Sequence, residues 1–144
     1  GGFPMGGMIA FGEKLAALFT PGSHGSTFAG NPLGAAAGLA TLDVIEDENL
    51  VANAEARGEQ LRDGIMATGN PLFVSVRGRG LLDAVELKHP CSHAVMNYCL
   101  EHGLIVNAVA PNALRFAPPL IVTAQDVDQA LAILKDVPTD LPDD

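Results

Sequence analysis

Hydrophobic residues recur at helical spacing in several segments of the chain. Apolar residues every three or four positions over 50–66 predict an amphipathic helix. An alanine-rich helix is predicted over 32–46, because Asn31 is a favoured N-cap and proline is favoured at the first helical position. Further helices are predicted at 13–19, at 92–102 with Ser92 as its cap, and from 123 onwards.

Short apolar runs between turn residues predict strands at 7–12, 73–77, 81–87, 104–109 and 114–117. Residues 78–80 (Gly-Arg-Gly) are expected to form a turn, since they lack the motif of a phosphate loop. From residue 50 onward, helices and strands alternate with short connections. This order favours an α+β arrangement, with helices on one face of a mostly antiparallel sheet. The acidic tail 136–144 is expected to fray.

The first third of the chain differs from the rest in charge and in glycine content. Residues 1–42 contain two formally charged side chains, Glu13 and Lys14, and ten of the sixteen glycines. Such a segment is typical of tightly packed backbone, a buried interface or a ligand cradle, and a poorly ordered arm is the alternative. Since the segment is also apolar, we expect it to be buried. A domain boundary is predicted near Asp47, which divides the chain into 1–46 and 47–144.

The chain of 144 residues is acidic, with 8 Lys and Arg against 17 Asp and Glu and a formal net charge of -9. Nucleic acid and anionic membranes are therefore not expected as partners. No apolar run approaches the roughly 20 residues of a membrane span. Two cysteines, Cys91 and Cys99, are too few for a disulfide framework, so reduced thiols and a cytoplasmic setting are expected.

Two sequence clusters could hold a ligand. The loop 24–32 places Ser26 and Thr27 among small residues just before a predicted helix, where N–H groups and the helix dipole favour an anion such as phosphate. A simple capping loop is the alternative. The second cluster, three histidines and both cysteines within 89–102, contains zinc-ligand residue types. Its spacing does not match a structural zinc site, and a polar turn leading into a helix explains it more simply, so no metal is expected.

Three sequence blocks resemble those of a known family. They are GGFPMGG at 1–7, PGSHGSTFAGNPL at 21–33 and LRFAPPL at 114–120. In order and spacing they are similar to the class III pyridoxal-phosphate-dependent aminotransferases, most of all to the acetylornithine-type members. The resemblance spans nearly the whole chain but only about the last third of a family member. It implies an α/β fold of type I, with 1–46 as the end of the cofactor-binding large domain and 47–144 as the small C-terminal α+β domain.

The resemblance also implies roles for three residues. Thr27 would bind the phosphate of pyridoxal 5'-phosphate across the interface of a homodimer, and Ser26 would contact the substrate. Arg115 would bind a substrate carboxylate, which its planar guanidinium can hold with two parallel hydrogen bonds. Without the resemblance, Arg115 would be interpreted as a surface residue whose stem packs on its neighbours.

The implied reaction moves the δ-amino group of N-acetylornithine to 2-oxoglutarate, a step of arginine biosynthesis. Related enzymes use ornithine, succinylornithine or 4-aminobutyrate. The family's Schiff-base lysine would precede Gly1, and Lys14, Lys88 and Lys135 do not stand at its position. We therefore expect no catalytic residue among these 144 and no turnover by this chain alone. A non-catalytic α+β binding or interaction module is the alternative.

Overall fold

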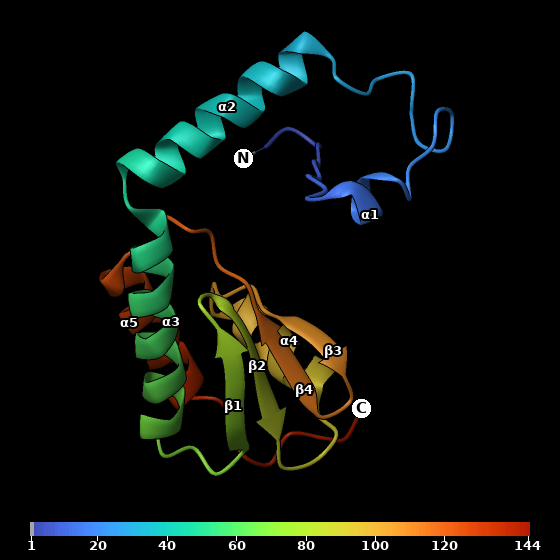
Figure 1. The fold of residues 1–144 in the computed structure, drawn as a ribbon. Helices are drawn as coiled ribbons and strands as arrows, with labels where there is room; N and C mark the ends of the chain where they lie inside the picture. Colours follow the sequence, from blue (N-terminus) through green and yellow to red (C-terminus); the bar gives the residue numbers. More distant parts are fainter. Residues whose placement is uncertain (1) are drawn as a thin grey trace. The chain divides into compact units, whose positions relative to one another are not determined.

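The structure is a computed structural model that describes residues 2–144. The chain forms two compact units, Gly1–Glu48 and Asn49–Asp144. Figure 1 shows the path of the chain, with the first unit in blue to blue-green and the second in green to red. Within 2–144, no helix is both long and apolar enough to cross a membrane.

The first unit contains two helices, α1 (Glu13–Ala16) and α2 (Pro32–Asp47). Helix α2 begins where predicted, because the Oδ1 atom of Asn31 accepts a hydrogen bond from the Gly34 N–H at 2.7 Å. Helix α1 is shorter than predicted, since the N–H groups of Leu18 and Phe19 bond to carbonyls three residues back rather than four. The strand predicted at 7–12 is wrong: that segment pairs with no strand in the described chain, and a strand needs such pairing.

The apolar side chains of the first unit are exposed within this chain, so the predicted burial does not come from packing inside the chain, and burial at an interface stays a prediction. Ile9, Phe11 and Phe28 are 78%, 79% and 81% exposed. Of the residues in α2, only Gly34 is buried. The physical reason is that one four-residue helix and one longer helix do not make two packed layers, and a hydrophobic face needs a second layer to cover it.

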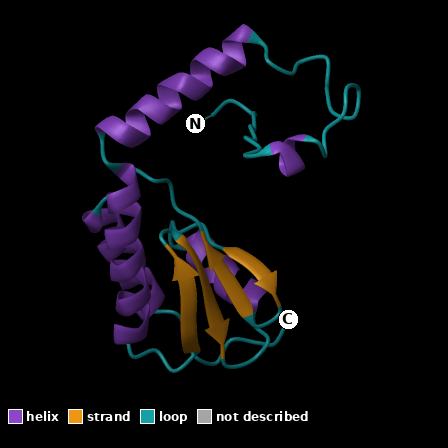
Figure 2. Cartoon of the chain, in the orientation of Figure 1, coloured by secondary structure: helices purple, strands orange, loops and turns teal. Residues whose placement is uncertain are grey.

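The second unit is a four-stranded sheet with three helices. The sheet has the order β1-β2-β4-β3, and all neighbouring strands are antiparallel. The elements are α3 (Leu50–Ala67), β1 (Phe73–Arg79), β2 (Leu82–Leu87), α4 (Ser92–Glu101), β3 (Asn107–Ala110), β4 (Ala113–Phe116) and α5 (Ala124–Lys135). The predicted antiparallel sheet with helices on one face is confirmed (Figure 2).

The core of the second unit lies between the sheet and its helices. Alternate strand residues point into it, among them Val85 and Leu87 of β2 and Leu114 and Phe116 of β4. The residues between them, Glu86 and Arg115, therefore lie on the opposite, open face of the sheet. This alternation is what places Arg115 on a surface without helices.

Several boundaries differ from the predicted ones. Strand β1 continues through Gly78 and Arg79, which pair with Asp83 and Leu82, so the predicted turn is confined to the next two residues. Gly80 makes that turn possible, because its φ of 55° is in the region that favours glycine. Helix α5 begins as predicted, with a complete capping box at its N-terminus.

The acidic tail is anchored to the second unit, so the prediction that it frays is wrong. Val137 is 2% exposed, and the Asn70 side-chain amide donates to its carbonyl at 2.8 Å. At the end of the tail, the Asp144 carboxylate accepts hydrogen bonds from Ser92 Oγ and the His93 N–H, each at 3.0 Å. A helix N-terminus leaves N–H groups unpaired and attracts negative charge, which explains the contact with α4. The prediction that Ser92 caps α4 is wrong, because Ser92 is the first residue of the helix and Cys91 occupies the cap position.

Candidate functional site

The loop between α1 and α2 carries two of the three predicted site residues, Ser26 and Thr27, and both are exposed. Two successive backbone hydrogen bonds shape the loop, from the Ala29 N–H to the Ser26 carbonyl at 3.1 Å and from the Asn31 N–H to the Phe28 carbonyl at 3.3 Å. The Asn31 side chain adds a third, from Nδ2 to the Phe28 carbonyl at 2.8 Å. These bonds fix the backbone on the C-terminal side of both hydroxyls.

The two hydroxyl groups fit a phosphate ligand. Within residues 2–144, neither the Ser26 nor the Thr27 hydroxyl makes a hydrogen bond, whereas the Ser23 hydroxyl donates to the Thr20 carbonyl at 2.7 Å. Phosphate oxygens accept hydrogen bonds from hydroxyl groups. The α2 terminus contributes less than predicted, because Pro32 has no N–H and the Gly34 N–H already donates to Asn31. The hydroxyls of the loop are thus the better donors.

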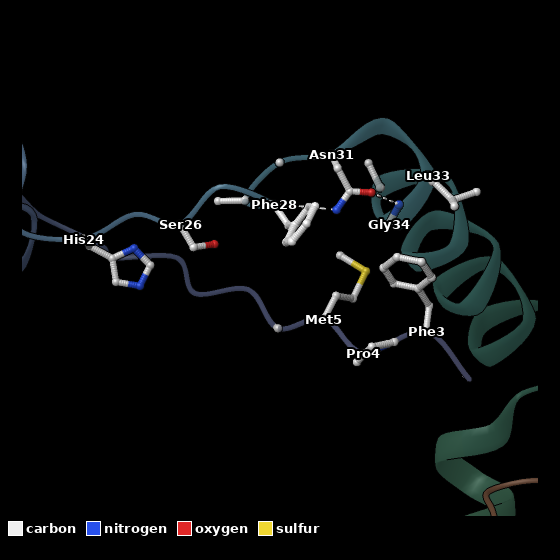
Figure 3. Close-up of a pocket in the computed structure, with 13 residues that line it drawn as sticks. Phe3, Pro4, Met5, His24, Ser26, Phe28, Asn31, Leu33 and Gly34 are labelled. Atoms are coloured by element: carbon white, nitrogen blue, oxygen red, sulfur yellow. Dashed lines mark hydrogen bonds between the residues drawn. The ribbon is translucent and has the colours of Figure 1, made fainter.

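A hollow of about 700 Å³ lies between this loop, the start of α2 and the N-terminal segment. Ser26 is among its lining residues and Thr27 is not. Figure 3 shows Phe3 and Met5 pointing from the N-terminal segment toward α2. A Cβ on Gly34 would lie 3.0 Å from a ring carbon of Phe3, and a Cβ on Gly38 would lie 2.9 Å from the Met5 sulfur. The small residues of α2 thus permit the close approach of side chains from the N-terminal segment.

The third predicted residue, Arg115, lies on β4 in the second unit and is exposed. Its Nη2 atom donates to Oδ1 of Asn107 at 3.3 Å. No carboxylate among residues 2–144 forms a salt bridge with Arg115. Its positive charge is therefore available to an external anion, and its remaining donors can form the paired hydrogen bonds that a carboxylate accepts.

Sequence reasoning missed a buried ion pair in the second unit. Arg62 Nη1 lies 3.0 Å from the Asp83 carboxylate and also donates to the Gly80 carbonyl at 2.9 Å. Burial raises the pKa of Asp83, and the hydrogen bond and charge of Arg62 lower it in part. The sequence of Leu82–Leu87 contained a sign of a buried charge, because an aspartate occupies a core position of its alternating pattern. This pair joins α3 to the β1–β2 turn and has a structural role.

The cysteine and histidine cluster does not form a metal site in the described residues. Cys91 and Cys99 are free and buried, and burial raises the pKa of Cys99 to about 11. The ring of His93 faces the Asp144 carboxylate at 3.0 Å. No group of three or more His, Cys, Asp or Glu side chains within 2–144 is placed to hold a metal ion.

Comparisons with known proteins identify relatives of the chain. The family described as Aminotransferase class-III has a model that matches residues 1–137. The acetylornithine aminotransferase of Gloeobacter violaceus is 43% identical over 145 residues, which cover 99% of this chain and 36% of that protein. The acetylornithine aminotransferase of Mycobacterium tuberculosis is 47% identical over 134 residues, which cover 93% of this chain and 33% of that protein. The chain spans about a third of the length of these relatives.

Solved structures show the same fold. The acetylornithine aminotransferase of Elizabethkingia anophelis is 38% identical with a TM-score of 0.73, over 84% of this chain and 33% of that one. The ornithine aminotransferase of Toxoplasma gondii is 34% identical with a TM-score of 0.74, over 85% and 30%. The predicted fold class is thus confirmed.

Proposed function

The chain belongs to the class III aminotransferase family, and from this membership we propose that the enzyme containing it transfers the δ-amino group of N-acetylornithine to 2-oxoglutarate. The observation that carries the proposal is the 43–47% identity with relatives named acetylornithine aminotransferase over almost all of this chain. The reaction would be a step of arginine biosynthesis. Ornithine is the second candidate donor, because solved ornithine aminotransferases reach TM-scores of 0.76.

In this proposal, residues 1–46 are the end of the cofactor-binding large domain and 47–144 are the small C-terminal domain. The division of the chain after Glu48 supports this assignment. The free thiols of Cys91 and Cys99 support a reducing compartment such as the cytoplasm.

Pyridoxal 5'-phosphate would supply the electron sink that amino transfer requires. The Thr27 hydroxyl would donate a hydrogen bond to a phosphate oxygen across the interface of a homodimer, and Ser26 would contact the amino donor. Among residues 2–144 neither hydroxyl has a hydrogen-bond partner, so both are free to bind a ligand, which supports these roles. A hydroxyl binds without adding a charge, so it orients the phosphate while leaving most of the electrostatic attraction to other groups.

Arg115 would bind a carboxylate of 2-oxoglutarate. Its exposure on the open face of the sheet and the lack of a salt bridge to it among the described residues support this role. The planar guanidinium donates two parallel hydrogen bonds to one carboxylate, which fixes the orientation of the substrate as well as its affinity.

The 144-residue chain alone would not turn over substrate. Lys14, Lys88 and Lys135 do not stand at the position that the family resemblance assigns to the cofactor-linking lysine. Replacing each of them by arginine in the full-length enzyme should therefore leave the rate of amino transfer close to that of the parent enzyme.

The proposal is tested by assaying the purified full-length enzyme for glutamate formation from 2-oxoglutarate. We expect kcat/KM for N-acetylornithine to exceed that for ornithine, succinylornithine and 4-aminobutyrate by about tenfold or more. Thr27→Ala should weaken the binding of pyridoxal phosphate by about tenfold, the value of one hydrogen bond to a charged group. Thr20→Ala is the matched control from the same loop. A higher kcat/KM for another donor would overturn the assignment of the substrate.

A further inference from the structure

The structure assigns Asn107 as a positioning residue for Arg115. We propose that its neutral amide oxygen holds the guanidinium on the open face of the sheet and leaves the positive charge for the carboxylate of the keto acid. This inference rests on the proposed role of Arg115 as the carboxylate-binding residue.

The two residues are direct partners on neighbouring strands. Asn107 pairs with Arg115 in the antiparallel ladder of β3 and β4, and the Nη2 to Oδ1 distance is 3.3 Å. Side chains directly opposite each other in such a ladder start from Cβ atoms roughly 5 Å apart and lie on the same face. The buried neighbours Leu114 and Phe116 fix the backbone of Arg115. Packing leaves its exposed side chain free, and Asn107 restrains the guanidinium at the end of that side chain.

The backbone next to Asn107 is also specified. The ladder register shifts between Ala108 and Ala110, so β3 has an irregularity one residue pair beyond the Asn107–Arg115 pair. Bulges of this kind re-aim side chains and end regular pairing. The pair is thus held on the regular side of the irregularity, where the two side chains stay in register.

The chemical nature of the acceptor decides what Arg115 can do. A guanidinium has five N–H donors, and a hydrogen bond to one amide oxygen leaves four of them for a ligand. Arg62 shows the opposite arrangement, because its guanidinium is paired with the buried carboxylate of Asp83. The carboxylate of Glu86, on the same open face, accepts a hydrogen bond from the Ser75 hydroxyl at 2.9 Å. Arg115 is oriented by a neutral group and keeps its full charge.

A purely structural role for Asn107 makes different predictions from a positioning role. If Asn107 only stabilised the β3–β4 hairpin, its loss would lower the stability and affect both substrates alike. If it positions Arg115, its loss would raise KM for the keto acid and leave kcat and the KM for the amino donor unchanged. An aspartate at this position would bind the guanidinium itself and compete with the substrate carboxylate.

The experiment compares Asn107→Ala, Asn107→Asp and Asn107→Gln in the full-length holoenzyme. We expect KM for 2-oxoglutarate to rise about 5-fold in Asn107→Ala and about 30-fold in Asn107→Asp. Asn107→Gln, which keeps an amide oxygen, should stay within about threefold of the parent. Asn112→Asp is the matched control, since it adds the same charge at the exposed turn of the same hairpin. Calorimetric titration with glutarate, an unreactive dicarboxylate, should give the same order of affinities.

The outcomes separate this inference from the proposed function. If Asn107→Asp behaves like Asn112→Asp while Arg115→Gln raises KM, the positioning role is wrong and the role of Arg115 stands. If Arg115→Gln leaves KM and the glutarate affinity unchanged, both are wrong. Equal changes in kcat and in both KM values, together with a lower melting temperature for Asn107→Ala and Asn107→Gln, would show a structural role and overturn the inference.

Discussion

The two units of the chain differ in how they treat their apolar side chains. In Asn49–Asp144, Leu114 and Leu134 are fully buried between the sheet and its helices. In the first unit, Phe11 and Phe28 are about 80% exposed although the segment is almost free of charge. The difference shows that apolar composition alone does not bury a segment. Burial also needs a second layer, and within residues 2–144 the sheet and helices of the second unit provide one while the two helices of the first unit do not.

The comparison also bears on function. A contiguous apolar surface larger than a few hundred Å² on a folded chain marks an interaction surface. The exposed Phe11 and Phe28 of the first unit are residue types that a partner or a further domain would cover in the proposed function. The second unit, which has its own core, presents Arg77 and Arg115 on the open face of its sheet, and the proposed function assigns the substrate carboxylate to Arg115.

The largest expected effect is on the core of the second unit. Leu114→Ala removes a fully buried side chain and should lower the free energy of unfolding by about 4 kcal/mol. Leu39→Ala in α2 is the matched control, and should change it by less than about 0.5 kcal/mol because Leu39 is exposed. Urea unfolding of the 144-residue chain measures both. Similar losses for the two variants would contradict the contrast between the units.

The buried ion pair gives the next largest effect. Arg62→Met leaves the Asp83 carboxylate buried without its partner and should destabilise the chain by about 3 kcal/mol. The additional change Asp83→Asn removes the uncompensated charge and should restore part of the loss. Thermal unfolding of the parent, the single variant and the double variant at neutral pH measures these differences in stability. If Arg62→Met costs no more than an ordinary surface substitution, the pair does not hold α3 to the β1–β2 turn.

A smaller, pH-dependent effect is expected at the tail. Partial burial raises the pKa of Asp144, but hydrogen bonds from His93 and Ser92 outweigh it and bring the value to about 2. A carboxyl group with a lowered pKa stabilises the fold above its unfolded pKa, and this contribution disappears as the pH falls toward its folded pKa.

Asp144→Asn should therefore lower the melting temperature at about pH 5, and the difference from the parent should shrink as the pH falls and vanish below about pH 2. Asp140→Asn is the control, because Asp140 lies in the same tail and is exposed. A difference that persists at low pH, or an equal effect of Asp140→Asn, would show that the tail is not held by this carboxylate.

Local signals predicted much of the fold. The start of α2 followed from Asn31 and Pro32, and the start of α5 followed from Thr123 and Asp126, because a cap needs only residues within one helical turn. The order of strands and helices after residue 50 gave the antiparallel sheet. These features depend on residues that are neighbours along the chain, so they can be predicted from the sequence alone.

Features that depend on distant residues were missed. The segment 7–12 has the composition of a strand but no strand to pair with. The tail looked mobile because its anchor, the N-terminus of α4, lies about fifty residues earlier. Asp83 could be flagged as a polar residue in a core position, but its partner Arg62 could not be assigned from sequence.

The candidate site was predictable only through the resemblance of whole blocks. Ser26 and Thr27 gave a weak local signal for an anion, and Arg115 alone resembled any exposed arginine on a strand. The structure adds what the sequence lacked: neither hydroxyl has a partner among the described residues, and Asn107 lies beside Arg115. These contacts depend on cross-strand register and loop geometry.

The most direct test of the central claim is the KM of the full-length enzyme for 2-oxoglutarate in Arg115→Gln, measured beside Arg77→Gln. Both arginines are exposed, and through Ala84 they belong to one row of paired residues across the sheet. We predict a rise of about 100-fold for Arg115→Gln, since two charge-assisted hydrogen bonds are lost, and less than about threefold for Arg77→Gln. Equal values of KM in the two variants would contradict the assignment of Arg115 as the residue that binds the keto acid.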